Sequence, residues 1–409
     1  MKKGEETSFN KDREALADNS ASADLPAREK SSEADRRAGN FSTREWLNYL
    51  ENSVLPPHPP ANPRSPFIPR NIHEAANILK IAAGLGFSLL RRKPAVWGTP
   101  VLAHIEPTSL CNLKCPLCPT GSGNITRRQT RLNYENFKTI IDKFPGTVKM
   151  LLLWNQGEPF MVKDLSRMIR YAKQRGMYVV TSTNGHFFRS DRIAGEVVAS
   201  GIDEIIISLD GADQTVYEKY RVGGKLEWVF DGIQWLVRAK KAQNKRSPLV
   251  HLQFILMQQN LHQRKDMIEL GRKLGADRLS FKTVQITDYA EGENYLPDDP
   301  AITRYVEKTG DGKHITRKRR FFADECLRLW FSLVVNCDGR VSPCCFDKDG
   351  DYALGNLIDD SFESVWFGRK YRDFRQHLLK SRYDLKMCND CTEGLKGLFL
   401  ETINYHREK

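Results

Sequence analysis

Three cysteines in one loop rich in proline and glycine are the residues of this sequence best suited to metal chemistry. Cys111, Cys115 and Cys118 follow C-x3-C-x2-C spacing within HIEPTSLCNLKCPLCPTGSG. Three thiolates from one loop can ligate three irons of a four-iron, four-sulfur cube, whereas a structural zinc or a protein-saturated cube needs a fourth thiolate or a histidine. No other cysteine lies nearby in the sequence. The spacing therefore predicts a [4Fe–4S] cluster with one iron open to a small molecule.

Six further cysteines lie towards the C-terminus, in the pattern C-x10-C-x6-C-C-x42-C-x2-C. The stretch NCDGRVSPCC is typical of a β-hairpin that turns at Asp338-Gly339. Taken alone, these thiols suit a zinc knuckle with four sulfur ligands as well as they suit an iron-sulfur cluster. The six residues are Cys326, Cys337, Cys344, Cys345, Cys388 and Cys391.

The first motif resembles the signature of the radical S-adenosylmethionine (SAM) enzymes, in which C-x3-C-x2-C follows the first barrel strand. The resemblance covers about residues 100 to 285. It implies that SAM binds the open iron of a [4Fe–4S] cluster and is cleaved to a 5′-deoxyadenosyl radical, which abstracts hydrogen from an unactivated C–H bond. Leu117 departs from the family, which commonly has an aromatic residue there. Stacking of that side chain on adenine is therefore absent.

The same resemblance implies SAM contacts after later strands, where a zwitterionic ligand with a charged sulfonium needs carboxylate and guanidinium partners. The GEP element at 157–159 looks like that of the family, with its glutamate or nearby backbone contacting the SAM amino group. The TNG stretch at 183–185 resembles the family's polar element, and the end of IIISLDG lies where ribose contacts are made. Arg221 lies where a cation often meets the SAM carboxylate in the family. Gln253, on the fifth strand, faces adenosine or the core. The implied residues are Gly157, Glu158, Pro159, Thr183, Asn184, Ser208, Asp210, Arg221 and Gln253.

The C-terminal cysteines, together with LGNL and SFESVW, resemble SPASM domains and the shorter twitch domains of radical SAM enzymes. This resemblance implies one auxiliary [4Fe–4S] cluster, and we therefore favour iron-sulfur over zinc. Cys337 and Cys345 are then spare, or Cys345 replaces Cys344. Six cysteines are too few for two auxiliary clusters ligated fully by thiolates. The implied ligands, in C-x17-C-x43-C-x2-C spacing, are Cys326, Cys344, Cys388 and Cys391.

The elements that must position these residues alternate between short apolar β-branched runs and amphipathic helices. This alternation predicts an α/β fold whose parallel sheet curls into a partial (β/α)6 barrel, with its chemistry at the carboxyl ends of the strands. We expect strands at 101–105, 148–154, 178–183, 204–209, 250–257 and 278–284, and helices near 134–144, 163–175, 190–199, 226–243 and 261–273.

Four regions are expected along the chain. Residues 1–66 are polar and end in a Pro-rich linker, which predicts disorder. Residues 67–99 are expected to form a helical extension, because residues 72–94 have a helical apolar pattern. We favour packing of this helix over one end of the following domain, and the alternative is that it lies on a membrane surface. The radical SAM core spans 100–310, and a small SPASM/twitch iron-sulfur domain spans 321–395.

Composition narrows the class of protein. The chain has 409 residues and a net charge of +12, and neither its first 25 residues nor any longer stretch has the apolar run of a signal peptide or a membrane span. We expect a cytoplasmic protein with reduced thiols. Its basic residues are scattered, and the densest run, RKRR at 317–320, is short, so nucleic acid is not expected as a partner. A reduced flavodoxin or ferredoxin with an acidic face suits the positive surface.

The reaction expected is oxidation of a small molecule, because a saturated auxiliary cluster can accept the electron that hydrogen abstraction leaves behind. The general run of the chain, with AVWGTP before the first strand and STNGHFF after the third, resembles radical SAM proteins from green sulfur bacteria and their relatives, among them those that hydroxylate the C-7 methyl group of bacteriochlorophyllide. We therefore expect oxidation or hydroxylation of a methyl group on a tetrapyrrole pigment. The alternatives are a twitch-type alcohol dehydrogenase, a peptide maturase and a non-catalytic iron-sulfur electron carrier. Five aromatic residues could line a barrel mouth wide enough for a flat tetrapyrrole, although we favour the interpretation that they pack in the core or at the rim. They are Trp154, Phe187, Phe188, Phe281 and Tyr289.

Overall fold

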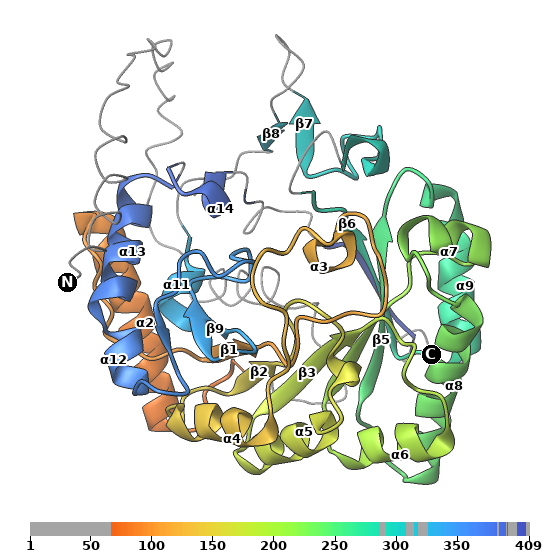
Figure 1. Cartoon of the computed structure of the whole chain (residues 1–409), viewed down its shortest axis with the longest axis horizontal. Helices are drawn as coiled ribbons and strands as arrows, with labels where there is room; N and C mark the ends of the chain where they lie inside the picture. Colours follow the sequence, from red (N-terminus) through yellow and green to blue (C-terminus); the bar gives the residue numbers. More distant parts are fainter. Residues whose placement is uncertain are drawn as a thin grey trace, which may run out of the picture. The chain divides into compact units, whose positions relative to one another are not determined.

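The computed structural model describes residues 67–286, 292–307, 315–317, 326–382, 384–389, 391 and 399–405 (Figure 1). Three of the sequence-based predictions, the disorder of residues 1–66, the position of Tyr289 and most of the RKRR run, fall outside these residues. Among the described residues, no helix is long and apolar enough to cross a membrane.

Six parallel strands form the centre of the structure, and they confirm the predicted partial barrel. They pair in chain order, and almost every residue in them is buried, as the near-continuous apolar runs predict for a parallel sheet covered by helices. The strands are β1 (Leu102–Ile105), β2 (Met150–Leu152), β3 (Tyr178–Thr183), β4 (Glu204–Ser208), β5 (Leu249–Leu256) and β6 (Arg278–Thr283).

Helices connect these strands and lie along the outer side of the sheet (Figure 1). Their starts follow from the sequence: the side chains of Asn133 and Ser190 accept hydrogen bonds from the backbone N–H groups of the first turns. The five predicted helices are α4 (Tyr134–Lys143), α5 (Leu165–Gln174), α6 (Asp191–Ala199), α8 (Leu226–Ala242) and α9 (Arg264–Leu274). The connections also contain α3 (Pro119–Ser122), α7 (Gln214–Tyr220), η2 (Pro159–Met161) and η3 (Leu261–Gln263).

The sheet continues beyond the six predicted strands at both edges. Strand β9 (Ser332–Val335) pairs in parallel with β1, with Ala103 opposite Leu333, and β10 (Arg340–Ser342) and β11 (Gly355–Asn356) follow in antiparallel order. At the other edge β12 (Phe399–Asn404) pairs antiparallel with β6. The cysteine-rich C-terminal part thus shares one sheet with the barrel.

The remaining elements surround this sheet. A two-stranded sheet pairs β7 with β8, and several short helices accompany the C-terminal strands. Their bounds are η4 (Glu293–Tyr295), β7 (Tyr305–Glu307), β8 (Ile315–Arg317), α11 (Arg328–Phe331), α12 (Phe362–Trp366), α13 (Arg369–Lys380) and α14 (Lys386–Asn389).

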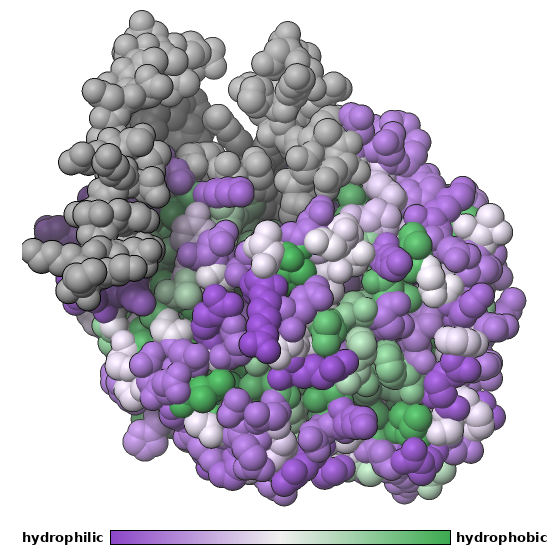
Figure 2. All heavy atoms as spheres, in the orientation of Figure 1, coloured by the Kyte–Doolittle hydropathy of each residue, from purple (hydrophilic) through white to green (hydrophobic). Residues whose placement is uncertain are grey.

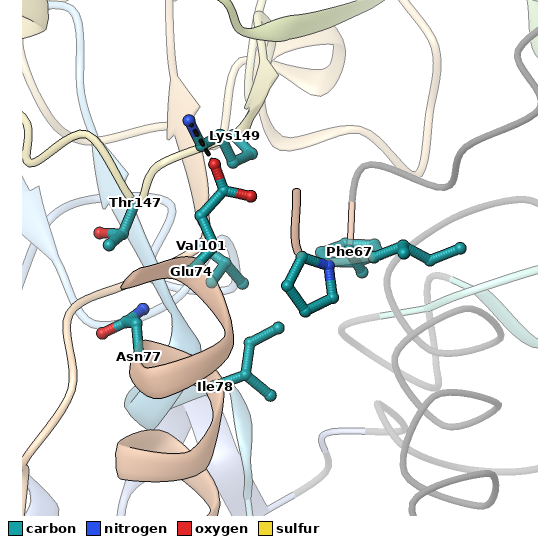
Figure 3. Close-up of a pocket in the computed structure, with 9 residues that line it drawn as sticks. Phe67, Glu74, Asn77, Ile78, Val101, Thr147 and Lys149 are labelled. Carbon is teal, nitrogen blue, oxygen red and sulfur yellow. Dashed lines mark ion pairs between the residues drawn. The ribbon is translucent and has the colours of Figure 1, made fainter. Parts of the chain in front are cut away.

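Helix α2 (Ile72–Arg91) packs against the domain, as the favoured interpretation of its pattern predicts. The Glu74 carboxylate pairs with the Lys149 ammonium at 2.9 Å, beside a small pocket that Phe67 and Val101 also line (Figure 3). This pocket lies at the amino ends of β1 and β2. It is therefore at the opposite end of the strands from the loop that carries the first three cysteines.

A buried histidine lies in the middle of β1. His104 is 5% exposed, and its ring meets that of Trp154 edge-on at 6.2 Å. Among the described residues, its Nε2 atom is buried without a hydrogen-bond partner. Burial, reinforced by the positive charges of Arg328 and Lys348, lowers the pKa of His104 to about 3. The ring is neutral in the folded protein at any pH above that value.

Replacing this residue tests its effect on acid stability. Because the unfolded chain binds a proton at its ordinary pKa of about 6.5 and the folded chain does not, His104 destabilises the fold as the pH falls below 6.5. We expect His104→Leu to avoid a loss of about 2 kcal/mol at pH 5 relative to pH 8 in urea unfolding. The exposed His262→Leu is the control. Parallel pH curves for wild type and His104→Leu would contradict the assignment.

Candidate metal and cofactor site

The three cysteines of the first motif lie on the loop that follows β1, at the carboxyl ends of the strands. Cys115 is buried, and Cys111 and Cys118 are half-buried against the same small apolar cluster. Residues that follow β5 and β6 supply much of this cluster. The apolar neighbours are Leu113, Leu117, Tyr220, Ile255, Met257, Val284, Ile286, Tyr295, Leu296 and Tyr305.

The type of donor at both cysteine sites is relevant to the metal that each could hold. Among the described residues, no three histidine, cysteine, aspartate or glutamate side chains gather closely enough to hold one metal ion. Thiolates around one zinc lie about 2.3 Å from the metal and therefore crowd together. Thiolates of an iron-sulfur cube each ligate a different iron and stand further apart. Both the first motif and the C-terminal pocket offer cysteine sulfurs in largely apolar surroundings, which is the type of donor that an iron-sulfur cube uses.

Hydrogen-bond donors point at the cysteine sulfurs. The backbone N–H of Leu113 donates to Cys111 Sγ at 3.5 Å, Asn184 Nδ2 lies 3.9 Å from the same sulfur, and Arg221 Nη1 lies 3.7 Å from Cys115 Sγ. Burial raises the pKa of the Cys111 thiol to about 11. Metal binding must therefore displace a firmly held proton, and the donors then stabilise the resulting thiolates.

Gly157 and Glu158 hold the second loop against the cysteine loop. Gly157 has a φ of +71°, and a Cβ atom there would meet the carbonyl oxygens of Thr108 and Leu110 at 2.4 and 2.6 Å. The backbone N–H of Glu158 donates to Leu110 O at 2.8 Å. Only glycine fits this close approach.

The Glu158 carboxylate is occupied by protein partners. Thr183 Oγ1 donates to its Oε1 at 2.7 Å, and the backbone N–H of Asn184 donates to its Oε2 at 2.8 Å. Burial raises its pKa to about 7, although these hydrogen bonds act in the opposite direction. The side chain therefore positions the Thr183-Asn184 loop, and contact of SAM with Glu158 or with the nearby backbone stays a prediction.

Asp210 and Arg221 form a buried ion pair next to the cysteines. Arg221 Nη2 lies 2.5 Å from Asp210 Oδ2, and the backbone N–H of Ile255 donates to Oδ1 at 2.7 Å. The charges of Asp210 and Cys115 raise the pKa of Arg221 despite burial, so the guanidinium remains charged. The structure thus brings the predicted residues together, with Asp210 holding Arg221 against the cysteine loop.

Two further predicted residues lie side by side on the sheet. Ser208 and Gln253 are opposite each other in the parallel register of β4 and β5, and both are half-buried. Their contact with adenosine stays a prediction.

The aromatic residues suggested for the barrel mouth divide into two groups. Trp154 and Phe187 are half-buried. Phe188 packs edge-on against Phe160 at 4.6 Å and Phe281 against Phe254 at 5.7 Å, and both Phe188 and Phe281 are fully buried. Placing these two at the mouth is therefore wrong, and the favoured interpretation of core packing is confirmed for them.

The four cysteines suggested for an auxiliary cluster line one pocket. They come from segments far apart in the sequence, and the pocket walls between them are largely apolar. Arg382 closes one side, where its Nη2 donates to Cys391 O at 3.0 Å. Cys345 accepts from Arg328 Nη1 at 3.2 Å. The residues that line the pocket are Cys326, Arg328, Leu329, Cys344, Phe346, Phe374, Leu378, Arg382, Met387, Cys388 and Cys391.

Sequence reasoning missed a buried network that joins the cysteine loop to the C-terminal hairpin. The fully buried Glu106, directly after β1, accepts from Arg127 Nη2 at 2.6 Å and from the backbone N–H groups of Gln156 and Cys337 at 3.1 and 3.2 Å. Arg127 Nε also donates to Lys348 O at 2.6 Å. The only sequence signal was a glutamate at a strand end, and nothing local identified its partners.

Two family models match the chain. The model of the radical SAM superfamily matches residues 105–271, and that of SPASM, an iron-sulfur cluster-binding domain, matches residues 326–392. The first match contains the three-cysteine loop, and the second contains all six C-terminal cysteines.

Curated relatives are similar over most of the chain. An AdoMet-dependent heme synthase of Nitratidesulfovibrio vulgaris is 26% identical over 72% of this chain and 86% of its own. The antilisterial bacteriocin subtilosin biosynthesis protein AlbA of Bacillus subtilis is 25% identical over 76% of this chain and 70% of its own.

Solved structures share the fold. Streptococcus suis SuiB bound to S-adenosylmethionine aligns with a TM-score of 0.51 and 13% identity, over 74% of this chain and 71% of its own. AnSMEcpe with bound AdoMet aligns with a TM-score of 0.50 and 14% identity, over 76% of this chain and 94% of its own.

Breaking the buried network tests its role. Glu106→Gln leaves the Arg127 guanidinium buried without its counter-charge, so we expect a loss of about 3–5 kcal/mol in urea unfolding. We also expect less iron at the three-cysteine loop after reconstitution, because Gln156 and Cys337 lose the carboxylate that fixes their backbones. The control is Arg192→Ala, which removes an exposed pair with Glu196 on α6 and should cost less than about 1 kcal/mol. Equal losses in the two variants would refute the role of Glu106.

Proposed function

The chain is a radical SAM enzyme with a C-terminal SPASM domain, and from that premise we propose that it catalyses the oxidation of an unactivated C–H bond in a small molecule. The radical SAM domain implies a [4Fe–4S] cluster that binds SAM, and the SPASM domain implies additional iron-sulfur clusters. One observation carries the assignment to oxidation: the four proposed auxiliary ligands line one largely apolar pocket.

We assign the cofactor-holding roles as follows. Cys111, Cys115 and Cys118 hold the SAM-binding cluster, and their apolar neighbours shield it from water. The four pocket cysteines hold one fully ligated auxiliary cluster, as in the shorter twitch arrangement. When bound, the first cluster with SAM would supply a 5′-deoxyadenosyl radical that takes one hydrogen atom from the substrate, and the second would accept the electron left behind. The carbon would then lose a proton or, in hydroxylation, bond to the oxygen of a water molecule that releases a proton, which completes a two-electron oxidation.

The residues of this chain bind and orient. Arg221, kept charged by Asp210, offers a cation to a carboxylate at the cysteine loop. The backbone near Glu158 offers carbonyl groups to an ammonium, and the Glu158 side chain fixes the Thr183-Asn184 loop at that place. Together they suit the amino-acid end of SAM, while Ser208 and Gln253 suit its adenosine end.

For the substrate we propose a tetrapyrrole pigment such as bacteriochlorophyllide, oxidised or hydroxylated at a methyl group. Support comes from the similarity to a heme synthase, since heme is a tetrapyrrole, and from Trp154 and Phe187, whose half-buried rings suit a flat macrocycle. The positive net charge suits a flavodoxin or ferredoxin donor with an acidic face. Reduced thiols at both sites suit the cytoplasm.

A peptide substrate is the second candidate, favoured by the similarity to a bacteriocin biosynthesis protein. Peptide maturases normally carry a winged-helix domain before the barrel. Within residues 67–101, the described part of the chain before β1, there is the single helix α2. We therefore rank a peptide below a tetrapyrrole. A twitch-type alcohol dehydrogenase would share the two-electron chemistry, and an electron carrier would not need the SAM-binding elements.

The SAM-binding assignment is tested by replacing Cys111, Cys115 and Cys118 together with alanine. We expect the reduced wild type to form 5′-deoxyadenosine from SAM anaerobically, faster with a methyl-bearing bacteriochlorophyllide than with a precursor peptide. The triple variant should form none while keeping the auxiliary cluster visible by electron paramagnetic resonance, since that pocket is built from other residues.

Three outcomes would change the conclusion. Cleavage retained in the triple variant would refute the cluster assignment. No 5′-deoxyadenosine from wild type with any candidate substrate would favour the electron carrier. Stimulation by the peptide alone would move the substrate to the second candidate.

The auxiliary site is tested by iron analysis. Two cubes give about eight irons and about eight sulfides per chain. We expect Cys388→Ala to leave about four irons and to abolish substrate oxidation, because one ligand of the auxiliary cube is lost. The matched control is Cys337→Ala, a buried cysteine outside the pocket, which should keep about eight irons. Wild type with about four irons and one zinc would overturn the auxiliary assignment in favour of a zinc knuckle.

A further inference from the structure

Exposed large apolar side chains of the described residues concentrate around one helix. Six of the seven lie between residues 68 and 97, on α2 and its flanking segments: Ile68, Ile72, Leu79, Phe87, Leu90 and Trp97. The seventh, Phe367, follows Trp366, whose indole Nε1 donates to Gly98 O at 3.0 Å. Figure 2 shows a mainly hydrophilic face with smaller, scattered apolar areas. The concentration therefore marks one surface.

The exposed residues form one stripe along the helix. Ile72, Leu79 and Leu90 are 76%, 69% and 81% exposed and are spaced by seven and eleven residues, close to whole numbers of helical turns. We call Ile72, Leu79, Phe87, Leu90 and Trp97 the α2 face. The opposite side of α2 supplies the contacts with the domain. Packing against the domain therefore does not account for large apolar side chains on the α2 face.

That opposite side is fixed to the protein by polar contacts. Asn77 Nδ2 donates to Thr99 O at 2.8 Å, and the backbone N–H of Thr99 donates to Asn77 Oδ1 at 2.9 Å. Ser88 Oγ donates to Gly84 O and accepts from the backbone N–H of Ala95 at 2.8 Å. The helix cannot rotate to bury its apolar stripe without breaking these bonds. The α2 face is therefore held outward.

The exposed charges of the segment that contains α2 have one sign. Between residues 67 and 100 the sequence has one acidic residue, Glu74, and it is buried and paired with Lys149. Every other ionised side chain of this segment is basic, and Arg91 lies 5.9 Å from the centre of the Phe87 ring, which in turn meets Trp97 at 5.6 Å. The exposed basic residues beside the stripe include Arg70, Lys80, Arg91 and Lys93.

We propose that the α2 face binds an anionic lipid surface, with α2 lying in the plane of the membrane. Leucine, isoleucine, phenylalanine and tryptophan enter the boundary between headgroups and acyl chains, and the basic side chains reach the lipid phosphates. Its 20 residues extend about 30 Å, which is long enough to lie along the membrane, whereas its charges prevent it from spanning. A second copy is the poorer occupant, because it would bring like charges together. This inference is independent of the reaction proposed above.

The test uses the full-length holoprotein and flotation with vesicles. We expect binding to vesicles of phosphatidylcholine with phosphatidylglycerol, weaker binding at high salt, and little binding to phosphatidylcholine alone. Leu79→Glu with Leu90→Glu, and separately Lys80→Glu with Lys93→Glu, should each lower the partition coefficient at least about tenfold. All four side chains are exposed, so iron content should not change.

The matched control reverses the same number of charges elsewhere. Lys265→Glu with Lys273→Glu alters exposed positions of α9, which lies on the other side of the molecule from α2 in Figure 1. We expect this variant to bind anionic vesicles within about twofold of wild type. Absence of vesicle binding by wild type, or an equal loss in the control and the α2 variants, overturns the proposal. A dimer in sedimentation that Leu79→Glu with Leu90→Glu dissociates, without vesicle binding, would assign the α2 face to a second copy instead.

Discussion

Parallel pairing on both sides of β1 is the constraint on which the rest of the structure depends. Strand β1 lies between β2 and β9 and runs parallel to both, so the carboxyl ends of all three strands lie next to one another. Glu106 stands at that point, and its carboxylate binds groups that follow each neighbouring strand as well as Arg127 from beyond the cysteine loop. A single buried carboxylate thus fixes three chain segments around the metal-binding loop.

The sequence predicted most of what depends on local periodicity. The bounds of β3 agree at both ends with the prediction, and α4, α6 and α8 agree within a residue, because apolar repeats and capping side chains act over a few residues. The pairing of β9 with β1 and of β12 with β6 joins segments more than a hundred residues apart, and no local pattern encodes such partners. The parallel core was therefore predictable, and the outer strands were not.

The candidate site shows the same division at the level of side chains. The motifs placed Glu158, Asp210 and Arg221 near the cysteine loop, yet they did not show that Glu158 and Asp210 use their oxygens on the protein itself. Nor did they separate Phe188 and Phe281, which are core residues, from the half-buried Phe187. Residue type indicates which chemistry a side chain can perform, whereas its partners depend on the direction in which the folded backbone points it.

The continuous sheet determines how the two cysteine sites are connected. Cys344 follows β10, β10 pairs with β9, and β9 pairs with β1, which leads into the three-cysteine loop. The path between the two cysteine sites therefore runs across hydrogen-bonded backbone rather than along a flexible tether. Backbone pairing of this kind fixes the separation of the two cysteine sites independently of the surface loops, so an electron exchanged between clusters bound there would cross a distance that variation in those loops does not change.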